Sequence, residues 1–370
     1  METVFIDGST GEGGGQILRT SLALACITGK TLRIENIRAA RRNPGMAKQH
    51  LSCVHAASQI CNACCDGAAL GSKTLDFQPG IVRSGDYHFD IGSAGSATLV
   101  IQTVLPALFL ADSPSTVTVT GGTHNPLAPP FDFLCETFLP AIATAGFYGN
   151  CKLIKPGFYP AGGGKITFEI QPATCPPNVW RINLAGKPWE RRPDKIIDLC
   201  KRTEQLVTCA RIYLARLPIH ITQHQEKLLC QSNLGIKNIE HIEVTNSDGP
   251  GNCVMLRFIG APPPFLSSTE DTGAKATVFT AFGMKGKPSQ EVVSEVVNLA
   301  KDFLSSDAAV DRFLADQLLI YMAFSQAGCF TTNELSSHLR TNIEVIKKFL
   351  PVDFTIDQQK QSYKVCCQPV

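Results

Sequence analysis

The sequence lacks the features that direct a protein to a membrane or to secretion. Its first residues, Met1 to Asp7, contain no basic start followed by an apolar stretch of signal-peptide length. The longest apolar run, from Ala97 to Ala111, contains Gln102 and Pro106 and is too short to cross a bilayer. We therefore expect a soluble intracellular protein, cytoplasmic or nuclear, that is not secreted and makes no membrane contact.

The sequence also lacks an excess of charge of either sign. Its 34 Lys and Arg residues face 32 Asp and Glu residues, so the formal net charge is only +2. This balance excludes a globally basic nucleic-acid protein, and an anionic partner must meet a local basic patch. With 44% hydrophobic and 18% charged residues, the chain is neither disordered nor a coiled coil.

Several common site motifs are missing as well. The chain has no P-loop, no G-x-G-x-x-G, no H-E-x-x-H and no nucleophile elbow. Its 15 cysteines are scattered mostly singly, which argues against a disulfide framework and favours reduced, mostly buried thiols. Cys61, Cys64 and Cys65 cluster at metal-like spacing, but no second pair follows, so we expect no structural zinc.

What the sequence does contain is an alternation of strand-like and helix-like segments. This alternation, with glycine clusters at 11–15, 121–122 and 162–164, predicts an α+β or α/β protein of repeated units. Helices are expected over 15–27, 47–59, 96–111, 131–145, 207–215, 289–303, 307–327 and 341–350. Strands are expected over 4–6, 31–37, 75–77, 86–91, 116–120 and 253–259, with a terminal pair around Phe354 and Tyr363.

The composition changes along the chain and predicts two domains. A Pro-containing break at 173–177 precedes a charged stretch at 187–204, and further breaks lie at 246–252 and 261–264. We interpret residues 185–276 as a small α/β domain inserted into a large domain formed by 1–184 and 277–370.

The first candidate site is the glycine-rich loop from Asp7 to Gln16. Its glycines let backbone N–H groups point into one concavity ahead of a helix N-terminus, an arrangement that binds phosphate. Glu12 would repel a phosphate unless a divalent metal bridges the two, and Arg19 lies one helical turn further on. The alternative is an ordinary tight turn with a solvated glutamate.

The second candidate is a basic segment that follows this loop. It contains Arg33, Arg38, Arg41, Arg42, Lys48, Gln49 and His50, opposed by Glu35. A segment this basic beside a phosphate-binding loop fits a nucleic-acid backbone. The alternative is a solvated surface.

A third candidate is one face of the helix expected at 307–327. Phe313, Asp316 and Gln317 are spaced i, i+3 and i+4 and therefore share one side of the helix. An aromatic ring for stacking and two hydrogen-bonding groups suit a nucleobase. The alternative is a helix edge with a core phenylalanine.

The fourth candidate is His338. Thr341 and Glu344 match a capping box, which predicts that a helix begins at Thr341 with His338 in the loop just before it. A neutral imidazole beside a helix end that favours anions is a good nucleophile toward phosphorus. A structural or solvated histidine is the alternative, and His124, in a glycine loop, is the nearest rival.

Taken together, these segments resemble the RNA 3′-terminal phosphate cyclase family, including its catalytically competent branch. The resemblance covers nearly the whole chain in order and is weakest over 185–276. It is carried by the motifs Asp7-Gly8-x-x-Gly11 to Arg19, Ile37-Arg38-Ala39, Pro44-Gly45, Gln49-His50-Leu51, Gly92 to Ser96, Gln102 to Pro106, Gly121-Gly122-Thr123, Ala128-Pro129-Pro130, Tyr159 to Gly164, Leu314 to Leu318 and Ser337-His338-Leu339.

The resemblance implies a fold and an activity. The large domain would consist of four-stranded sheets, each with two helices, and the inserted domain would be thioredoxin-like. The activity would be ATP-dependent conversion of an RNA 3′-phosphate to a 2′,3′-cyclic phosphate, a ligase-type nucleotidyl transfer in RNA processing. It would pass through a covalent His338–AMP intermediate and an RNA adenylate, with Mg²⁺ or Mn²⁺ as the metal.

The resemblance also assigns roles to individual positions. Glu12 matches a metal contact, Arg19 a phosphate contact, Gln102 a polar group of the ATP site and Pro129 one side of an adenine sandwich. Asp316 and Gln317 match contacts to base and ribose, and Arg38, Arg41 and Gln49 match positions near the RNA terminal phosphate. The chain departs from the family at Phe313, where tyrosine is usual, so stacking is kept and a hydroxyl is lost; it departs also at Pro156, before Gly157.

Two other functions compete with this one. A non-catalytic relative that binds RNA in ribosome assembly would lack the nucleophilic histidine, and an enolpyruvyl-transferase-like enzyme would need more Lys and Arg and no such histidine. The presence of His338, Glu12, Arg19 and Gln317 favours the cyclase. The sequence leaves the oligomeric state open, a homodimer included.

Overall fold

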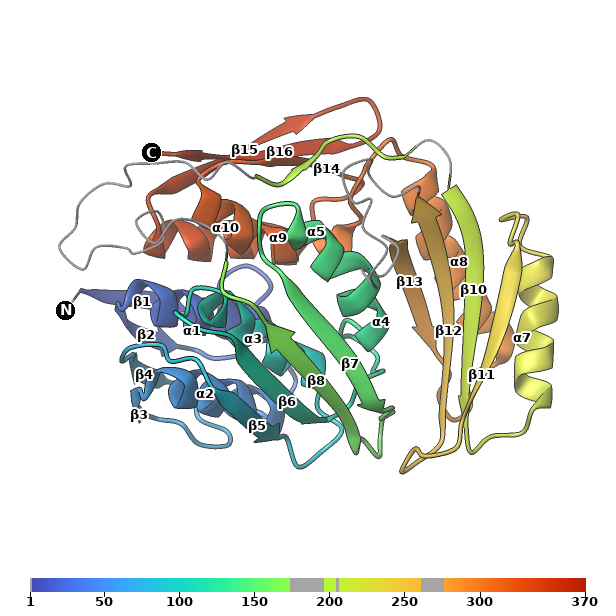
Figure 1. The fold of residues 1–370 in the computed structure, drawn as a ribbon, viewed down its shortest axis with the longest axis horizontal. Helices are drawn as coiled ribbons and strands as arrows, with labels where there is room; N and C mark the ends of the chain where they lie inside the picture. The colour runs from blue at the N-terminus through green and yellow to red at the C-terminus, as the bar shows by residue number, and fades with distance from the viewer. Residues whose placement is uncertain (1, 174–195, 204–205, 261–275) are drawn as a thin grey trace.

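The computed structural model describes residues 2–173, 196–203, 206–260 and 276–370. In this part of the chain, mixed parallel and antiparallel strands form several four-stranded sheets with helices packed against them (Figure 1). The mixed α/β architecture predicted from the sequence is therefore confirmed.

Three of the sheets belong to units of the same topology. Unit 1 comprises β1 (Thr3–Asp7), α1 (Gly15–Thr28), β2 (Thr31–Glu35), α2 (Lys48–Cys61), β3 (Cys64–Asp66) and β4 (Leu75–Gln78). Unit 2 comprises β5 (Asp86–Asp90), α3 (Ala97–Leu108), β6 (Ser115–Gly121), α4 (Phe131–Phe133), the π-helix η1 (Leu134–Phe138), α5 (Leu139–Ala143), β7 (Gly149–Lys155) and β8 (Gly164–Ile170). Unit 3 comprises β9 (Asp198–Leu199), α9 (Arg312–Ser325), β14 (Cys329–Thr332), α10 (Ser337–Phe349), β15 (Val352–Gln358) and β16 (Tyr363–Pro369).

The strand order is equivalent in the three units: β1-β2-β4-β3, β5-β6-β8-β7 and β9-β14-β16-β15. In each unit the first two strands are parallel and the remaining pairs are antiparallel. A parallel pair needs a crossover connection, which explains why a helix follows the first strand of every unit. The predicted repetition of units is thus present in the structure, although the sequence shows it only weakly.

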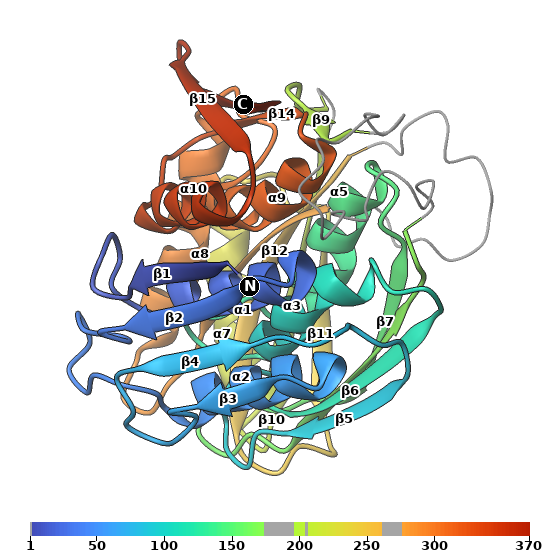
Figure 2. The ribbon, with the colours of Figure 1, turned by 90° about the vertical axis from the view of Figure 1, so that its left-hand side faces the viewer.

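The helices of the three units meet in the middle of the large body. Helix α1 contacts α3 and α10, and α10 contacts α9, while the sheets lie on the outside (Figures 1 and 2). Buried apolar side chains from all three units form one continuous core, including Leu18, Val104, Leu318 and Ile346. The N-termini of helices from different units are therefore brought close to one another.

The fourth sheet forms the insert, which we define as residues 206–304. It comprises β10 (Leu206–Ala215), α7 (His220–Cys230), β11 (Asn238–Val244), β12 (Gly251–Gly260), β13 (Ala276–Phe282) and α8 (Ser289–Leu304), with strand order β11-β10-β12-β13. Helices α7 and α8 cover one face of the sheet over a separate apolar cluster. The opposite face packs with Phe158 of unit 2 (Figure 1).

The insert interrupts unit 3 between β9 and α9. The predicted domain limits of 185 and 276 differ from this arrangement, because β9 pairs with β14 of unit 3 while β13 and α8 complete the insert. The predicted residues 185–195 and 261–275 lie outside the described residues. The division of the chain into two domains itself stays a prediction.

Two secondary-structure predictions are wrong. Residues 207–215 form the strand β10 rather than a helix, because they pair with β12 and, from Cys209 onward, with β11. Helix α10 begins at Ser337 rather than at Thr341, because Ser336 caps it: its Oγ accepts a hydrogen bond from the Leu339 amide. His338 therefore lies in the first helical turn.

The expectation of reduced thiols is wrong for four cysteines. Disulfides join Cys135 to Cys151 and Cys329 to Cys366. The second pair is brought together by the sheet, since Cys329 and Cys366 are register partners on β14 and β16, 37 residues apart in sequence. The described cysteines outside these pairs are free, and those that are buried are Cys26, Cys53, Cys61, Cys253 and Cys367.

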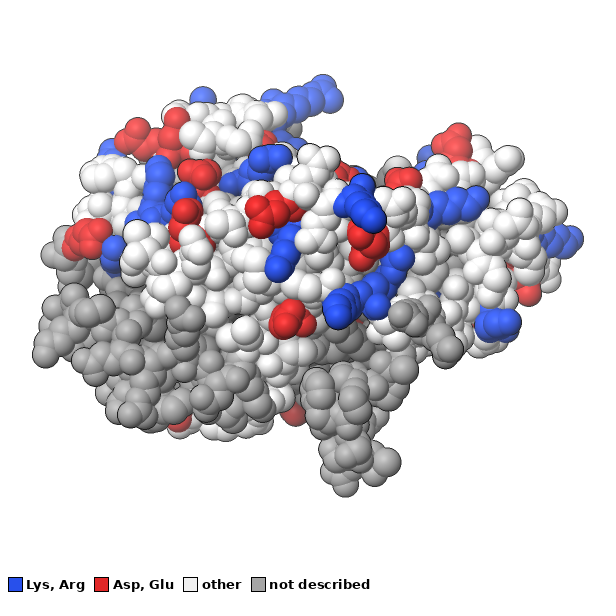
Figure 3. All heavy atoms as spheres, turned by 90° about the horizontal axis from the view of Figure 1, so that it is seen from above, with Lys and Arg blue, Asp and Glu red and all other residues white. Residues whose placement is uncertain are grey.

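The surface agrees with the balanced composition. On the face shown in Figure 3, Lys and Arg side chains alternate with Asp and Glu side chains and form no extended field of one sign. Within the described residues, no helix is both long enough and apolar enough to span a bilayer.

Candidate functional site

The glycine-rich loop between β1 and α1 is held against helix α10. Gly11 has a positive φ of 58°, and a Cβ at this position would collide with the Thr341 hydroxyl. The backbone N–H of Glu12 donates to Thr341 Oγ1 at 3.2 Å, and Thr341 Oγ1 in turn donates to the Ser337 carbonyl at 2.7 Å. Glycine at position 11 thus allows the first and the third unit to touch where the loop bends.

This contact brings Glu12, Arg41 and His338 together. Glu12 Oε2 accepts a hydrogen bond from Arg41 Nη2 at 2.8 Å, and Glu12 Oε1 lies 3.8 Å from His338 Nδ1. Only 4% of the Glu12 side chain is exposed. The carboxylate that sequence reasoning placed in the loop is therefore nearly enclosed and lies between a guanidinium and an imidazole.

His338 is half-exposed, and no hydrogen bond to a described residue occupies either of its ring nitrogens. Burial lowers the pKa of His338 below its ordinary value, as do the charges of Arg19 and Arg41, whereas Glu12 opposes the change. The imidazole is accordingly neutral near neutral pH. Because Nδ1 faces Glu12, Nε2 is the nitrogen available to a reactant.

Four predicted residues line one cavity of about 50 Å³ between helices α1, α3, α9 and α10. They are Arg19, Gln102, Asp316 and Gln317, and Gln102 Nε2 donates a hydrogen bond to Gln317 Oε1. Each of the three units contributes at least one of these side chains. The prediction that these positions share a site is consistent with this geometry.

Asp316 and Arg19 are the charged groups of this cavity. Desolvation raises the pKa of Asp316 to about 8, an effect that the positive charge of Arg19 partly offsets. Desolvation likewise lowers the pKa of Arg19, while Glu12 and Asp316 oppose that shift. A largely protonated carboxyl at position 316 can both donate and accept a hydrogen bond, as recognition of a nucleobase edge requires.

Phe313 and Pro129 lie outside the residues that line the cavity. Phe313 is in the first turn of α9, one turn before Gln317, and its ring is 39% exposed with the Arg312 guanidinium 4.9 Å away. The Pro129 carbonyl accepts a hydrogen bond from Thr98 Oγ1 at 2.7 Å, which ties the loop after β6 to helix α3. The exposed ring at 313 is free to stack on a flat ligand.

The predicted RNA-phosphate residues are held in different ways. Arg38 has a positive φ of 57° and donates to the carbonyls of Asn43 and Gly45, so it shapes the loop that carries Arg41. Gln49 Oε1 accepts from the Ser96 amide at 2.8 Å and so links α2 to the N-terminus of α3. Of the three predicted residues, only Arg41 contacts Glu12.

Sequence reasoning missed two residues at this site. Buried His50 packs against Gly15, where a Cβ would overlap its ring, and burial together with Arg19, Arg38 and Arg41 lowers its pKa to about 3. Asn342 accepts a hydrogen bond from Thr20 Oγ1 and donates one to the Asp316 carbonyl. The sequence signal for His50 was its place in the basic segment. The signal for Asn342 was its place directly after Thr341, a residue that was interpreted only as part of a helix cap.

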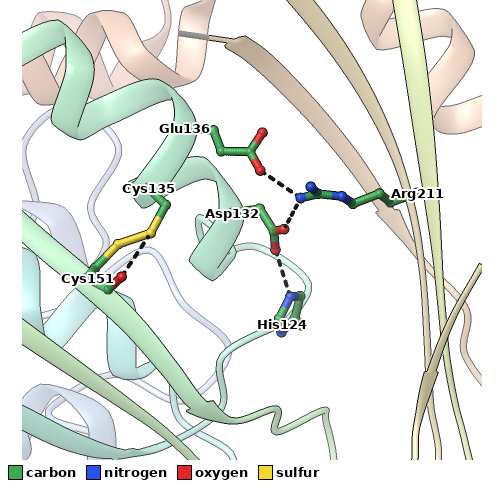
Figure 4. The surroundings of a disulfide bond; sticks show 6 residues. All are labelled: His124, Asp132, Cys135, Glu136, Cys151 and Arg211. Carbon is green, nitrogen blue, oxygen red and sulfur yellow. Dashed lines mark hydrogen bonds and ion pairs between the residues drawn. A yellow bond between two sulfur atoms is a disulfide. The ribbon is translucent and has the colours of Figure 1, made fainter. Parts of the chain in front are cut away.

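His124, the rival histidine, belongs to a different cluster between unit 2 and the insert. Its Nδ1 hydrogen-bonds to Thr123 Oγ1 at 2.8 Å and its Nε2 to Asp132 Oδ2 at 2.9 Å. Asp132 also accepts from Tyr213 of the insert and from Arg211 of the insert; Figure 4 shows the contact with Arg211. Since both nitrogens of the fully buried ring are engaged, His124 is not available as a nucleophile.

The chemistry of the Glu12 site fits one ligand position of a divalent metal. No group of three His, Cys, Asp or Glu residues in the described ranges is placed to hold an ion. Mg²⁺, however, is commonly bound by one or two carboxylates together with substrate phosphates. The nearly enclosed Glu12 carboxylate could supply such a ligand.

The fold and the site define a protein of three repeated β-α-β-α-β-β units, with a cavity lined by residues of all three units and a cluster of Glu12, Arg41 and His338 at the glycine loop. The model of the RNA 3′-terminal phosphate cyclase family matches residues 10–356, and the chain belongs to this family. An RNA 3′-terminal phosphate cyclase of Koribacter versatilis is 44% identical over 368 residues, which cover 99% of this chain and 95% of the relative.

Two further curated relatives have the same name. The protein of Salmonella enteritidis is 42% identical over 363 residues, covering 98% of each chain. The protein of Ralstonia nicotianae is 42% identical over 363 residues, covering 98% of this chain and 96% of the relative.

Proposed function

We propose that this protein converts RNA 3′-phosphate ends to 2′,3′-cyclic phosphates at the expense of ATP, through a covalent His338–AMP intermediate. The observation that carries the proposal is the position of His338, whose Nδ1 lies 3.8 Å from Glu12 of the glycine loop. Membership of the cyclase family and the names of the relatives support the RNA substrate. Two alternatives, RNA binding without catalysis and enolpyruvyl transfer, do not require this histidine.

In the first step, His338 Nε2 attacks the α-phosphorus of ATP. A nitrogen–phosphorus bond forms, the bond between the α-phosphorus and the bridging oxygen breaks, and pyrophosphate leaves. The neutral imidazole, favoured by its lowered pKa, supplies the electron pair. The nearby Glu12 carboxylate stabilises the positive charge that develops on the ring in the transition state.

In the later steps, the adenylyl group is transferred from His338 to the RNA 3′-phosphate and is then displaced as AMP. An oxygen of the RNA 3′-phosphate attacks the same phosphorus, the nitrogen–phosphorus bond breaks, and His338 is regenerated. The adjacent ribose 2′-OH then loses its proton and attacks the 3′-phosphorus, which expels AMP. AMP is a far better leaving group than a phosphate oxygen, so adenylylation makes ring closure feasible.

The described geometry supports two groups of binding residues. We assign Arg19, Gln102, Asp316 and Gln317 to ATP, because they line one cavity. The resemblance to the family adds Phe313 and Pro129 on either side of the base. We assign Arg38, Arg41 and Gln49 to the RNA terminal phosphate. Arg41 would then exchange its contact with Glu12 for one with phosphate.

A divalent metal, Mg²⁺ or Mn²⁺, is part of the proposal. Glu12 would hold it together with phosphate oxygens, and when bound it would neutralise charge on the phosphates. The residues described above would still bind and align both reactants. Removal of metal by EDTA is expected to prevent adenylylation.

The decisive experiment is incubation of the protein with α-labelled ATP and Mg²⁺ in the absence of RNA. We expect a covalent label on the wild type and no label on His338→Ala. The matched control is His224→Ala, which changes an exposed histidine on α7 and should be labelled like the wild type. Absence of label on the wild type would contradict the proposal and favour a non-catalytic RNA-binding protein.

The substrate is tested with matched oligonucleotides. RNA with a 3′-phosphate should be cyclised, whereas DNA with a 3′-phosphate should accumulate as the adenylate because it has no 2′-OH. Equal processing of both ends would contradict the proposed ring closure.

A further inference from the structure

The connection between β6 and β7 contains a π-helical turn where a continuous helix was expected. In η1 the backbone N–H of Leu139 donates to the carbonyl of Leu134, five residues earlier. Such turns are less stable than α-helix and occur mostly at functional sites. They insert one residue into the helix, which rotates the side chains on either side of the turn by about 100° relative to an α-helical register. Contacts from outside the helix must therefore hold η1.

Those contacts come from the insert. Glu136 Oε1 accepts from Arg211 Nη1 and Glu136 Oε2 accepts from Arg257 Nε, both at 2.6 Å, with only 12% of the Glu136 side chain exposed (Figure 4 shows the first of these contacts). The next residue, Thr137, donates from Oγ1 to the Ala276 carbonyl of β13 at 2.6 Å. Two consecutive residues of the turn are thus fixed to three strands of the insert.

The third residue of this series faces the opposite way. Phe138 is 1% exposed and lines the same cavity as Arg19, Gln102 and Asp316. Its ring packs edge-on against Tyr321, another wall of the cavity, with centroids 5.6 Å apart. A change in the register of η1 would therefore move a wall of the pocket.

We propose that Glu136 and Arg257 are positioning residues through which the insert sets the shape of the ATP pocket. The inference rests on the proposed function of that pocket. Loss of Glu136 leaves the partly buried Arg257 without its counter-ion, and loss of Arg257 leaves Glu136 with Arg211 alone and its Oε2 without a partner; either change favours a rearrangement of the turn. The pocket wall formed by Phe138 then shifts, so ATP binds more weakly while the chemistry at His338 is unchanged.

The test uses the rate of self-labelling by ATP as a function of ATP concentration. Arg257→Met is expected to raise the half-saturating ATP concentration by roughly tenfold, with the maximal rate within about twofold of the wild type. Arg257→Lys keeps a positive charge within reach of Glu136 and should restore most of the affinity. Glu240→Gln removes the exposed ion-pair partner of Arg211 but leaves the contacts of η1 with the insert in place. This variant should behave as the wild type.

A second readout does not depend on activity. Amide hydrogen exchange at residues 134–139 of the nucleotide-free protein should be faster in Arg257→Met than in Arg257→Lys or Glu240→Gln. If Arg257→Met does not fold, Thr137→Val replaces it as the test variant. This substitution removes only the hydrogen bond from the Thr137 hydroxyl to the Ala276 carbonyl and should raise the half-saturating ATP concentration by roughly threefold.

The outcomes separate this inference from the proposed function. Folded Arg257→Met or Thr137→Val with unchanged ATP dependence and unchanged exchange would overturn the coupling, as would a loss of maximal rate with unchanged half-saturation. A wild-type protein that is not labelled at all would overturn the proposed function, and with it this inference.

Discussion

At the scale of single residues, the environment of His338 determines when it can act as a nucleophile. The ring is partly removed from water and lies within the field of Arg19 and Arg41, with Glu12 as the opposing charge. These three charges all come from unit 1, whereas His338 belongs to unit 3. The reactivity of this one side chain is thus a property of the contact between units 1 and 3.

The first prediction concerns the pH dependence of adenylylation. Because the pKa of His338 is lowered from 6.5, the neutral nucleophile predominates above that lowered value, and the rate should fall only in more acidic solution. Glu12→Gln removes the charge that raises the pKa, so the acidic limb should move to still lower pH. Single-turnover labelling of the wild type and of Glu12→Gln between about pH 5 and pH 8 measures the acidic limb of each pH–rate profile. A wild-type limb above pH 6.5 would contradict the prediction.

The second prediction concerns Phe313, where the family usually has tyrosine. Phe313→Tyr restores a hydroxyl on a half-exposed ring and should lower the half-saturating ATP concentration roughly two- to tenfold, the range expected for one hydrogen bond. Phe313→Leu removes the stacking surface and should have the opposite effect. Titration of self-labelling with ATP compares the three proteins, and indistinguishable curves would exclude a role in binding.

Much of the candidate site could be predicted from the sequence, and the remainder could not for a physical reason. Glu12 and Arg19 share a loop and a helix turn, and Asp316 and Gln317 share a helix face, so local spacing was sufficient. Thr341 acts through a contact with Gly11 that exists only after units 1 and 3 pack together, whereas His50 contacts Gly15 once α1 and α2 of unit 1 pack. A side chain whose partner is another unit leaves no local pattern in the sequence.

At the scale of elements, α10 carries His338, the proposed nucleophile, in its first turn. The N-cap of this helix is Ser336, and the chain turns from extended to helical just two residues before His338. The capping hydrogen bond from Leu339 to Ser336 Oγ measures 3.0 Å. The orientation of the imidazole therefore depends on a single hydroxyl.

The third prediction tests this dependence. Ser336→Ala should cost about 1 kcal/mol of stability and fray the first turn, which lowers the rate of self-labelling more than the ATP affinity. Ser336→Thr keeps the capping oxygen and serves as the matched control. Thermal unfolding and labelling kinetics measure the two effects. Equal rates for Ala and Thr variants would show that the cap does not orient His338.

The elements of the fold were largely predictable, and the exceptions are instructive. Helices α1, α2 and α8 have an apolar stripe with clear stops, and they were placed within two residues of their observed ends. Strand β10 was taken for a helix because the strands that pair with it, β11 and β12, lie further along the chain and leave no signal in residues 207–215 themselves. The π-turn η1 was missed because it depends on the insert rather than on its own residues.

At the scale of the whole molecule, three units and an insert share one site. Arg19 comes from unit 1, Gln102 from unit 2 and Asp316 from unit 3, while the insert fixes η1. The third unit has the shortest first strand of the three, β9, with two residues. A covalent link between β14 and β16 strengthens this unit.

The fourth prediction concerns that link, the disulfide between Cys329 and Cys366. Cys366→Ser should lower the free energy of unfolding by about 2–4 kcal/mol in oxidising buffer, as expected for closure of a loop of this length. A reductant should destabilise the wild type more than the variant, which retains only the disulfide between Cys135 and Cys151. The control is Cys230→Ser, which changes an exposed free thiol and should unfold like the wild type. Denaturant titrations that fail to separate Cys366→Ser from the control would contradict the prediction.

The interruption of unit 3 between β9 and α9 has a consequence for synthesis on the ribosome. The nascent chain emerges with the glycine loop first, and more than 300 residues must follow before His338 leaves the exit tunnel. Units 1 and 2 can fold while the insert is still being translated, so α9 and α10 dock last onto an existing surface. In the proposed mechanism, labelling by ATP would thus require that α10 has been synthesised and has docked against the glycine loop.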